Sequence, residues 1–206
     1  AQGELARLGV SPITISAHPT VLASPISPQY EPLRLSGAIA SREAGETITI
    51  QANECSFPGW RDVETARTEA GGRWELGVDQ SSGLAPTKTT FRAKWRTATS
   101  AGVTVQTRPG VNLGQTTRTR WGVGVLALRS FLDRVGLFQR FDRDRGRWIT
   151  VKRFRLTRKD SVPAGSWTYG RFRARVPRGS LVRAVIPRSQ VKPCYLAGYS
   201  LLLEAR

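Results

Sequence analysis

The chain has 206 residues, and its 32 Lys and Arg against 15 Asp and Glu give a net charge of +17. Hydrophobic residues make up 39% of it, yet no stretch approaches the roughly 20 consecutive apolar residues of a transmembrane helix. We therefore expect one large or two small folded domains and no insertion into a membrane.

Residues 1–32 are predicted to form an extended N-terminal arm. One short segment alternates like a strand: Ile13, Thr14, Ile15, Ser16 and Ala17. Four prolines then interrupt the chain, because proline cannot donate to a sheet ladder: Pro19, Pro25, Pro28 and Pro32. Two placements are open. Either the arm supplies the first strand of its own domain, or it adds to a sheet edge of a neighbouring chain, residues 1–10 included.

Residues 33–108 are predicted to be the first domain. Its expected strands are 33–39, 47–51, 63–69, 73–78, 91–95 and 103–105. The turn Ala70-Gly71-Gly72 is predicted to join residues 63–69 and 73–78 as a hairpin, and residues 53–59 to form a loop that carries Cys55.

Residues 109–206 are predicted to be the second domain. Its expected strands are 121–128, 135–141, 146–156, 172–176, 181–186 and 199–203, and residues 160–168 are expected to form a loop. The many short strands, and the absence of a helical pattern of useful length, are typical of β-sandwiches.

A weak internal repeat links the two domains. Gly59-Trp60 and Gly146-Arg147-Trp148 each begin a run with a valine three residues after the tryptophan. Each run is followed by a second glycine-bounded strand, at residues 72–78 and 170–176. The repeat predicts one β unit used twice, and we expect Trp74 and Trp148 to lie in the two cores.

Three sets of motifs carry a resemblance to a known family: GWRDVETARTEAGGRWELGV, TTFRAKW, and GRWITVKRFRL with GRFRARVPRG, VRAVIP and YLAGYS. Over residues 11–206 the chain resembles the tandem bacterial immunoglobulin-like domains of secreted actinobacterial proteins. The resemblance implies an all-β fold of two tandem immunoglobulin-like β-sandwich domains with an extended N-terminal arm. It brings no shared catalytic or metal-binding residues. The chain departs from the family at residues 81–88, at 160–167 and in the arm.

The residues do not favour an enzyme or a cofactor. His18 is the only histidine, which argues against a catalytic triad or a histidine-based zinc site. The acids that lie closest in sequence, such as Asp142 and Asp144, sit in turns beside arginines. Cys55 and Cys194 lie one in each domain, and three states are open: a bridge between the domains, a bridge between chains, or free thiols.

The distribution of charge is the clearest functional signal. Residues 11–108 hold ten Lys and Arg against nine Asp and Glu, whereas residues 109–206 hold 21 against five. Alternation predicts that the arginines share faces of two strands, and the candidate anion-binding residues are Arg153, Arg155, Arg171, Arg173 and Arg175. Most aromatic residues fit the inward face, so nucleic acid ranks below other polyanions.

These features predict a secreted, non-enzymatic structural protein, a subunit of an extracellular filament or surface assembly. The start Ala1-Gln2-Gly3, without methionine, is what removal of a signal peptide would leave. The expected partner is a second copy of the chain in a head-to-tail polymer, joined through the arm. The alternative is a binding or adhesion module whose second domain holds an anionic polymer: a cell-wall polyanion, an acidic polysaccharide or extracellular DNA. An acidic protein surface is a further candidate partner.

Overall fold

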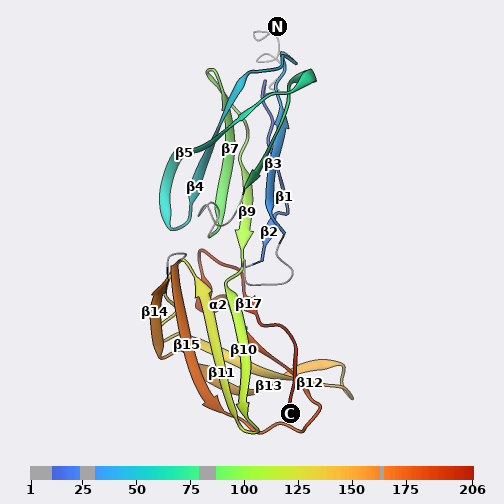
Figure 1. Cartoon of the computed structure of the whole chain (residues 1–206), viewed down its shortest axis with the longest axis vertical. Helices are drawn as coiled ribbons and strands as arrows, with labels where there is room; N and C mark the ends of the chain where they lie inside the picture. The colour runs from blue at the N-terminus through green and yellow to red at the C-terminus, as the bar shows by residue number, and fades with distance from the viewer. Residues whose placement is uncertain (1–10, 24–30, 79–86, 163–164) are drawn as a thin grey trace. The chain divides into compact units, whose positions relative to one another are not determined.

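The computed structural model describes residues 11–23, 31–78, 87–162 and 165–206. The chain forms two compact units: unit 1 comprises residues 1–22 and 31–107, and unit 2 comprises residues 23–30 and 108–206. Nearly all described elements are strands (Figure 1), which confirms the all-β prediction. None of the helices in the described part is long and apolar enough to span a membrane.

Unit 1 has two sheets. The smaller runs in the order β1 (Ser16–His18), β3 (Leu33–Ala38), β6 (Arg73–Val78). The larger runs in the order β2 (Val21–Leu22), β9 (Val103–Thr107), β7 (Thr89–Trp95), β4 (Thr47–Glu54), β5 (Phe57–Arg67), and β8 (Ala98–Thr99) pairs with β7. One hydrophobic cluster takes residues from both, including Leu35 and Trp74 from the smaller sheet and Ile50 and Phe91 from the larger. The two sheets therefore pack as a sandwich.

The hairpin predicted between residues 63–69 and 73–78 is wrong. β5 pairs with β4 in the larger sheet, whereas β6 pairs with β3 in the smaller one. The connection includes the short 3₁₀ turn Ala70–Gly72, in which Gly71 and Gly72 both have positive φ. Glycine at such a turn permits a crossover between sheets as readily as a hairpin. The predicted loop at 53–59 is also shorter, since β4 ends at Glu54 and β5 begins at Phe57.

The described part of the arm, apart from Ala23, belongs to unit 1. β1 pairs antiparallel with β3, and Ile13 forms a bridge with Ile39. Ile13 is 1% exposed and joins the hydrophobic cluster. This is the alternative in which the arm supplies a strand of its own domain. Strand exchange between chains remains a prediction, and residues 1–10, with Pro25 and Pro28, lie outside the described residues.

Replacing Ile13 by alanine is expected to lower the free energy of unfolding of unit 1 by about 2–5 kcal/mol, because a buried side chain leaves a cavity. Val21→Ala is the control within the same arm. Val21 is 39% exposed, and its loss is expected to cost about 0.5 kcal/mol or less. Urea denaturation of both variants checks this, and equal midpoints would mean that the arm does not contribute to the core.

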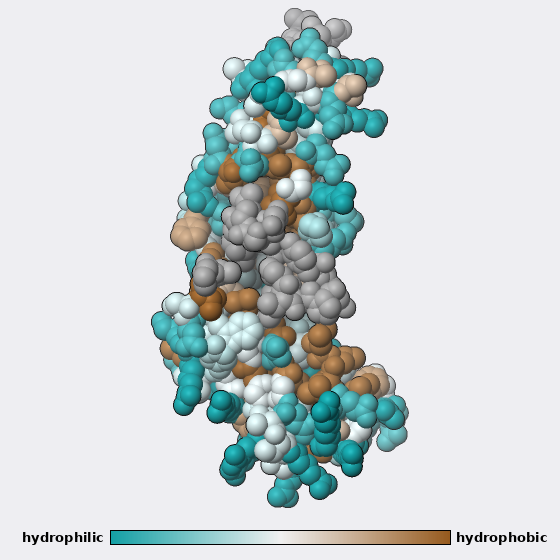
Figure 2. All heavy atoms as spheres, in the orientation of Figure 1, coloured by the Kyte–Doolittle hydropathy of each residue, from teal (hydrophilic) through white to brown (hydrophobic). Residues whose placement is uncertain are grey.

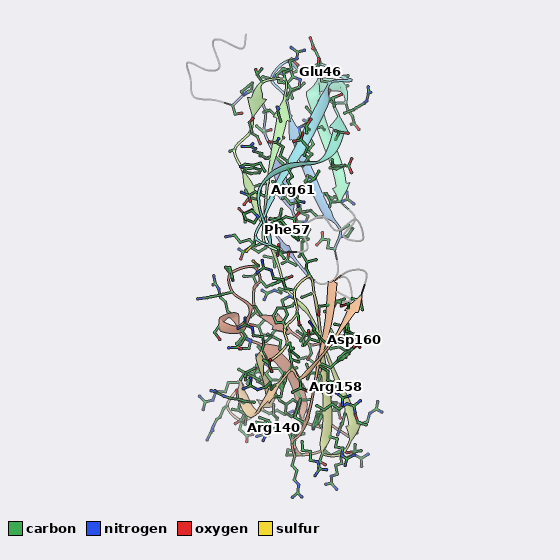
Figure 3. The ribbon with its side chains drawn as sticks, turned by 90° about the vertical axis from the view of Figure 1, so that its left-hand side faces the viewer. Glu46, Phe57, Arg61, Arg140, Arg158 and Asp160 are labelled. Carbon is green, nitrogen blue, oxygen red and sulfur yellow. The ribbon has the colours of Figure 1, made fainter. Side chains whose placement is uncertain are left out.

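Glu46 comes just before β4 and lies at one end of unit 1 (Figure 3). Its carboxylate accepts hydrogen bonds from the Trp95 indole, at 2.9 Å, and from the Arg96 guanidinium, at 2.8 Å. The hydrogen bond from Trp95, followed by that from Arg96, lowers the pKa of Glu46 below its ordinary 4.5.

The depressed pKa of Glu46 predicts a pH-dependent contribution to stability. Its stabilisation is present above the ordinary pKa of 4.5 and is lost as the pH falls through the lower folded-state pKa. We expect Glu46→Gln to melt below the parent at pH 6, with the difference shrinking by pH 3. A constant difference in melting temperature across this range would contradict the assignment.

Unit 2 also has two sheets. One runs in the order β10 (Gly110–Thr117), β11 (Arg120–Ala127), β15 (Gly165–Arg173), β14 (Arg158–Val162). The other runs in the order β13 (Arg147–Arg155), β12 (Val135–Asp142), β16 (Leu181–Ile186), β17 (Gly198–Tyr199), and β18 (Leu203–Glu204) pairs with β16. A single helical turn, α2 (Arg188–Val191), follows β16. Figure 1 shows the first sheet in front of β12 and β13.

Aromatic rings hold the two sheets of unit 2 together. The centroid of Phe138 on β12 lies 4.7 Å from that of Trp121 on β11 and 5.1 Å from that of Phe172 on β15. Phe172 also stacks on Phe154 of β13, with centroids 5.0 Å apart. These contacts alternate between the sheets, so unit 2 is a sandwich whose two sheets are joined by a series of aromatic contacts.

Three further expectations for unit 2 are corrected. The segment 160–168, predicted as a loop, contributes to a hairpin of β14 and β15. The strand predicted at 172–176 begins at Gly165 and ends at Arg173. The strand predicted at 199–203 is divided into β17 and β18, which both pair with β16.

The internal repeat has a structural counterpart, which we call the Gln–Arg–Trp tier. In unit 1 the tier comprises Gln51 on β4, Trp60 on β5 and Arg92 on β7. The Arg92 Nε donates to the Gln51 amide oxygen at 2.7 Å, and its guanidinium lies 4.0 Å from the centroid of the Trp60 ring.

In unit 2 the tier comprises Gln139 on β12, Trp148 on β13 and Arg183 on β16. The corresponding distances are 3.0 Å from Arg183 to Gln139 and 4.1 Å from Arg183 to the Trp148 ring. A register shift adjoins the glutamine in both units. The same three residue types therefore make the same contacts on equivalent strands.

The tier corrects the expectation that Trp148 lies in the core. Trp148 is half-buried, lies under the Arg183 guanidinium and contacts the tilted Phe141 ring on the outside of its sheet. Trp74, the other expected core tryptophan, is 2% exposed and does belong to the core of unit 1.

Neither cysteine is a free thiol. Cys55, between β4 and β5, and Cys194, which is 2% exposed, are both disulfide-bonded. The sequence left open a bridge within one chain and a bridge between chains. Non-reducing electrophoresis distinguishes them, because only a bridge between chains gives bands larger than the monomer.

Candidate anion-binding groove

Unit 2 carries the whole net charge of the protein. Residues 1–107 hold ten Lys and Arg and ten Asp and Glu, whereas residues 108–206 hold 22 against five. The difference of 17 equals the charge of the chain. A net charge of this size and sign favours the approach of anions to unit 2.

Two glycines of β11 open the outer face of the β10-β11-β15-β14 sheet. Alternation along β11 buries Trp121, Val123 and Val125 in the core and leaves Gly122 and Gly124 on the outer face. A Cβ built on Gly122 would meet no atom within 4 Å. The middle of this face therefore lacks the side chains that would fill it.

On β15 the outer positions hold two aromatic residues and an arginine. Arg171 is paired with Gly122, Tyr169 with Gly124, and Trp167 with Leu126. A Cβ on Gly124 would lie 2.7 Å from the Trp167 ring, so the indole rests against the sheet where that glycine makes room. The centroids of Trp167 and Tyr169 are 5.8 Å apart, and the rings are tilted by 56°.

β14 completes this face with two charged residues. Arg158 is paired with Tyr169 and Asp160 with Trp167, and Figure 3 shows both along β14. Asn112 of β10 reaches the opposite side of the same face, paired with Gly124. In Figure 2, teal and white residues rather than a continuous brown patch cover the β14 and β15 side of this face.

These residues surround a hollow of about 560 Å³, which we call the aromatic hollow. Its lining includes Asn112, Gly122, Arg158, Asp160, Trp167 and Arg171. The volume is typical of sites that hold small ligands. Because every lining residue is in unit 2, the hollow is formed by one sandwich.

The acid in the aromatic hollow is held in place by Tyr169. The Tyr169 hydroxyl donates to Asp160 Oδ2 at 2.8 Å. Burial of the ring, followed by the hydrogen bond to the carboxylate, raises the pKa of Tyr169 above its ordinary 10.0. The phenol therefore remains a donor at neutral pH, and Asp160 keeps lone pairs free to accept from a ligand hydroxyl.

The arginines of the aromatic hollow are not neutralised by protein carboxylates. Within the described residues, neither Arg158 nor Arg171 takes part in an ion pair. Guanidinium groups in this state can form two-pronged contacts with a ligand carboxylate, sulfate or phosphate. No group of three or more His, Cys, Asp and Glu side chains in the described part of the chain is placed to hold a metal ion.

The structure does not bring the five predicted arginines together. Arg171 lines the aromatic hollow, and Arg173 lies two residues further along the outer face of β15, paired with Arg120. Arg175 lies beyond the end of β15. Arg153 and Arg155 are exposed on β13 in the other sheet, where Arg155 donates to the Asp133 carbonyl oxygen at 3.0 Å.

Sequence reasoning missed the aromatic wall of the site. Trp167 and Tyr169 were expected in or beside an inserted loop, and most aromatics were expected to face inward. The period-two spacing of Trp167, Tyr169, Arg171 and Arg173 was the available signal, because it places all four on one face of a strand. The glycines at 122 and 124, alternating with buried residues, were the second signal.

Comparison with known proteins adds little to this geometry. No protein-family model matches the chain, and no curated protein matches it. The chain is similar to a solved structure described as the tetra-tandem repeat in the extending region of a large adhesion protein, at 14% sequence identity and a TM-score of 0.32. The match covers 94% of this chain and 49% of that one, so the chain spans about half its length. We draw nothing from a likeness at this TM-score, and membership of the immunoglobulin-like family remains a prediction.

Proposed function

We propose that the protein is a non-enzymatic surface or adhesion module whose second unit binds an anionic polymer in the aromatic hollow. One observation carries this proposal: Arg158 and Arg171, which form no ion pair within the described residues, line the same hollow as the Trp167 and Tyr169 rings and the glycines of β11. The arginines supply charge recognition, and the rings supply a fixed apolar surface.

The filament assembly predicted from the sequence is the less supported of the two functions. Its mechanism requires the arm to leave its own sheet and pair with another chain. In the described residues β1 pairs with β3 and Ile13 is buried in unit 1. Extracellular location accords with a module of this kind and is part of the proposal.

The proposal is tested by filling the hollow without changing charge. In Gly122→Ile the new side chain enters open space and suits a strand. We expect this variant of the full chain to elute from a heparin column at lower salt than the parent, with an unchanged melting temperature. Gly77→Ile is the matched control, because Gly77 on β6 of unit 1 also has no atom within 4 Å of an added Cβ.

If Gly122→Ile elutes at the same salt concentration as the parent, retention on heparin depends only on net charge. The aromatic hollow would then not be the binding site. A drop for both glycine variants would point to a general effect of isoleucine on the strands.

A further inference from the structure

Unit 2 contains a second hollow of about 590 Å³, which we call the arginine hollow. It lies along the far part of β10, from Gly114 to Thr117, includes Arg118 just after that strand, and reaches Arg178, Glu204 and Arg206. Its lining contains three arginines and one glutamate, so its side chains carry a net positive charge. The C-terminal backbone is fixed beside it, because the Gln115 amide accepts from the Arg206 N–H at 2.9 Å and donates to the Arg206 carbonyl oxygen at 3.2 Å.

Each hollow has one member of a pair of neighbouring glycines in its lining. Gly114, which lines the arginine hollow, is the register partner of Gly122, which lines the aromatic hollow. A Cβ on either glycine would meet nothing within 4 Å. No side chain therefore stands between the hollows at this pair, and a chain-like ligand can pass from one to the other across β10 and β11.

We infer that the ligand is a linear acidic polysaccharide that occupies both hollows at once, crossing the Gly114–Gly122 pair. This inference rests on the proposed function and narrows its anionic polymer to one class. Each sugar of such a chain brings an acidic group for the arginines and hydroxyls for the polar residues, and the repeat of the chain places the same chemistry in both hollows.

The polar residues favour a polysaccharide over nucleic acid. Asp160 can accept hydrogen bonds from sugar hydroxyls, and the Asn112 amide can both accept from and donate to them. Nucleic acid without sequence preference needs successive aromatic platforms. Trp167 and Tyr169 are tilted by 56° and form one patch, and the described lining of the arginine hollow contains no aromatic residue.

Occupation of two connected hollows predicts a dependence on ligand length. A disaccharide fills one hollow, whereas a longer chain links both binding events and gains affinity without new contacts at either end. For the full-length protein we expect octagalacturonate to bind about 100-fold more tightly than digalacturonate in isothermal titration calorimetry. The longer chain offers several positions at which a single hollow can bind it, so the two affinities are compared after correction for this number. Equal corrected affinities for octagalacturonate and digalacturonate would overturn the inference.

Variants of the arginine hollow separate this inference from the proposed function. We expect the double variant Arg118→Gln and Arg178→Gln to bind octagalacturonate about tenfold or more weakly and to bind digalacturonate, held in the aromatic hollow, as the parent does. Unchanged octagalacturonate binding would remove the arginine hollow from the site and leave the aromatic hollow intact. If Gly122→Ile instead binds both octagalacturonate and digalacturonate as the parent does, the proposed function is wrong.

An octadeoxythymidylate titration decides the class of polymer. We expect it to bind more weakly than octagalacturonate at equal salt, because its bases meet a single aromatic patch in the described lining and its internal deoxyriboses carry no hydroxyl for Asp160 or Asn112. Tighter binding of the oligonucleotide would overturn the assignment to a polysaccharide.

Discussion

Replacing Trp121 by alanine is expected to lower the free energy of unfolding of unit 2 by about 3–5 kcal/mol. Trp121 is 1% exposed, its ring lies 4.7 Å from that of Phe138, and its indole N–H donates to the Ala174 carbonyl oxygen at 3.1 Å. Alanine would leave a cavity between the sheets and a buried carbonyl oxygen without its partner.

Trp148 provides the matched control for Trp121. It is also a tryptophan of unit 2, but it is half-buried and lies on Arg183 outside the core. Its replacement by alanine is expected to cost about 1 kcal/mol, the value of a partly exposed cation–π contact. Chemical denaturation of the two variants makes the comparison, and a larger loss for Trp148→Ala would mean that the inner and outer faces of unit 2 are wrongly placed.

The double variant Arg158→Gln and Arg171→Gln is expected to weaken polyanion binding about 100-fold or more. A hydrogen bond to a charged group contributes about 1.5–3 kcal/mol, and 1.4 kcal/mol is a tenfold change in affinity. Both side chains line the aromatic hollow and have no protein carboxylate as partner in the described residues. Glutamine keeps part of the length and polarity and removes the charge.

A variant of equal charge change in unit 1 controls for the field of the whole protein. Arg67 and Arg73 are exposed on β5 and β6, and their joint replacement by glutamine is expected to change binding by less than about threefold at physiological salt, because distant charges are screened. The measurement is calorimetric titration with octagalacturonate at several salt concentrations. Equal losses for the two double variants would show that affinity follows net charge and not the hollow.

The positions of most strands were predictable from the sequence because alternation is a local property. β16 coincides with the predicted range 181–186, and β12 extends the predicted 135–141 by one residue. The pairing of the strands was harder to predict from the sequence than their positions. The turn Ala70-Gly71-Gly72 has the composition of a hairpin turn, and only the packing of both sheets around Trp74 places β5 and β6 in different sheets.

The candidate site was only partly predictable. Net charge identified the second half of the chain, and alternation placed Arg171 and Arg173 on one face. The aromatic hollow itself depends on the absence of side chains at Gly122 and Gly124, which matters only when β11 lies beside β15. That neighbour relation joins residues about 50 positions apart and is set by the fold as a whole.

The Gln–Arg–Trp tier has a consequence for how such a protein diversifies. The same contacts persist in one copy without net charge and in another that carries +17. The residue beside the tier glutamine also differs, since Gln51 donates to Asp62 at 2.6 Å and Gln139 to Thr150 at 3.5 Å. The tier contacts therefore do not depend on the charge of the unit that carries them, and the same framework is compatible with an opposite sheet of very different charge.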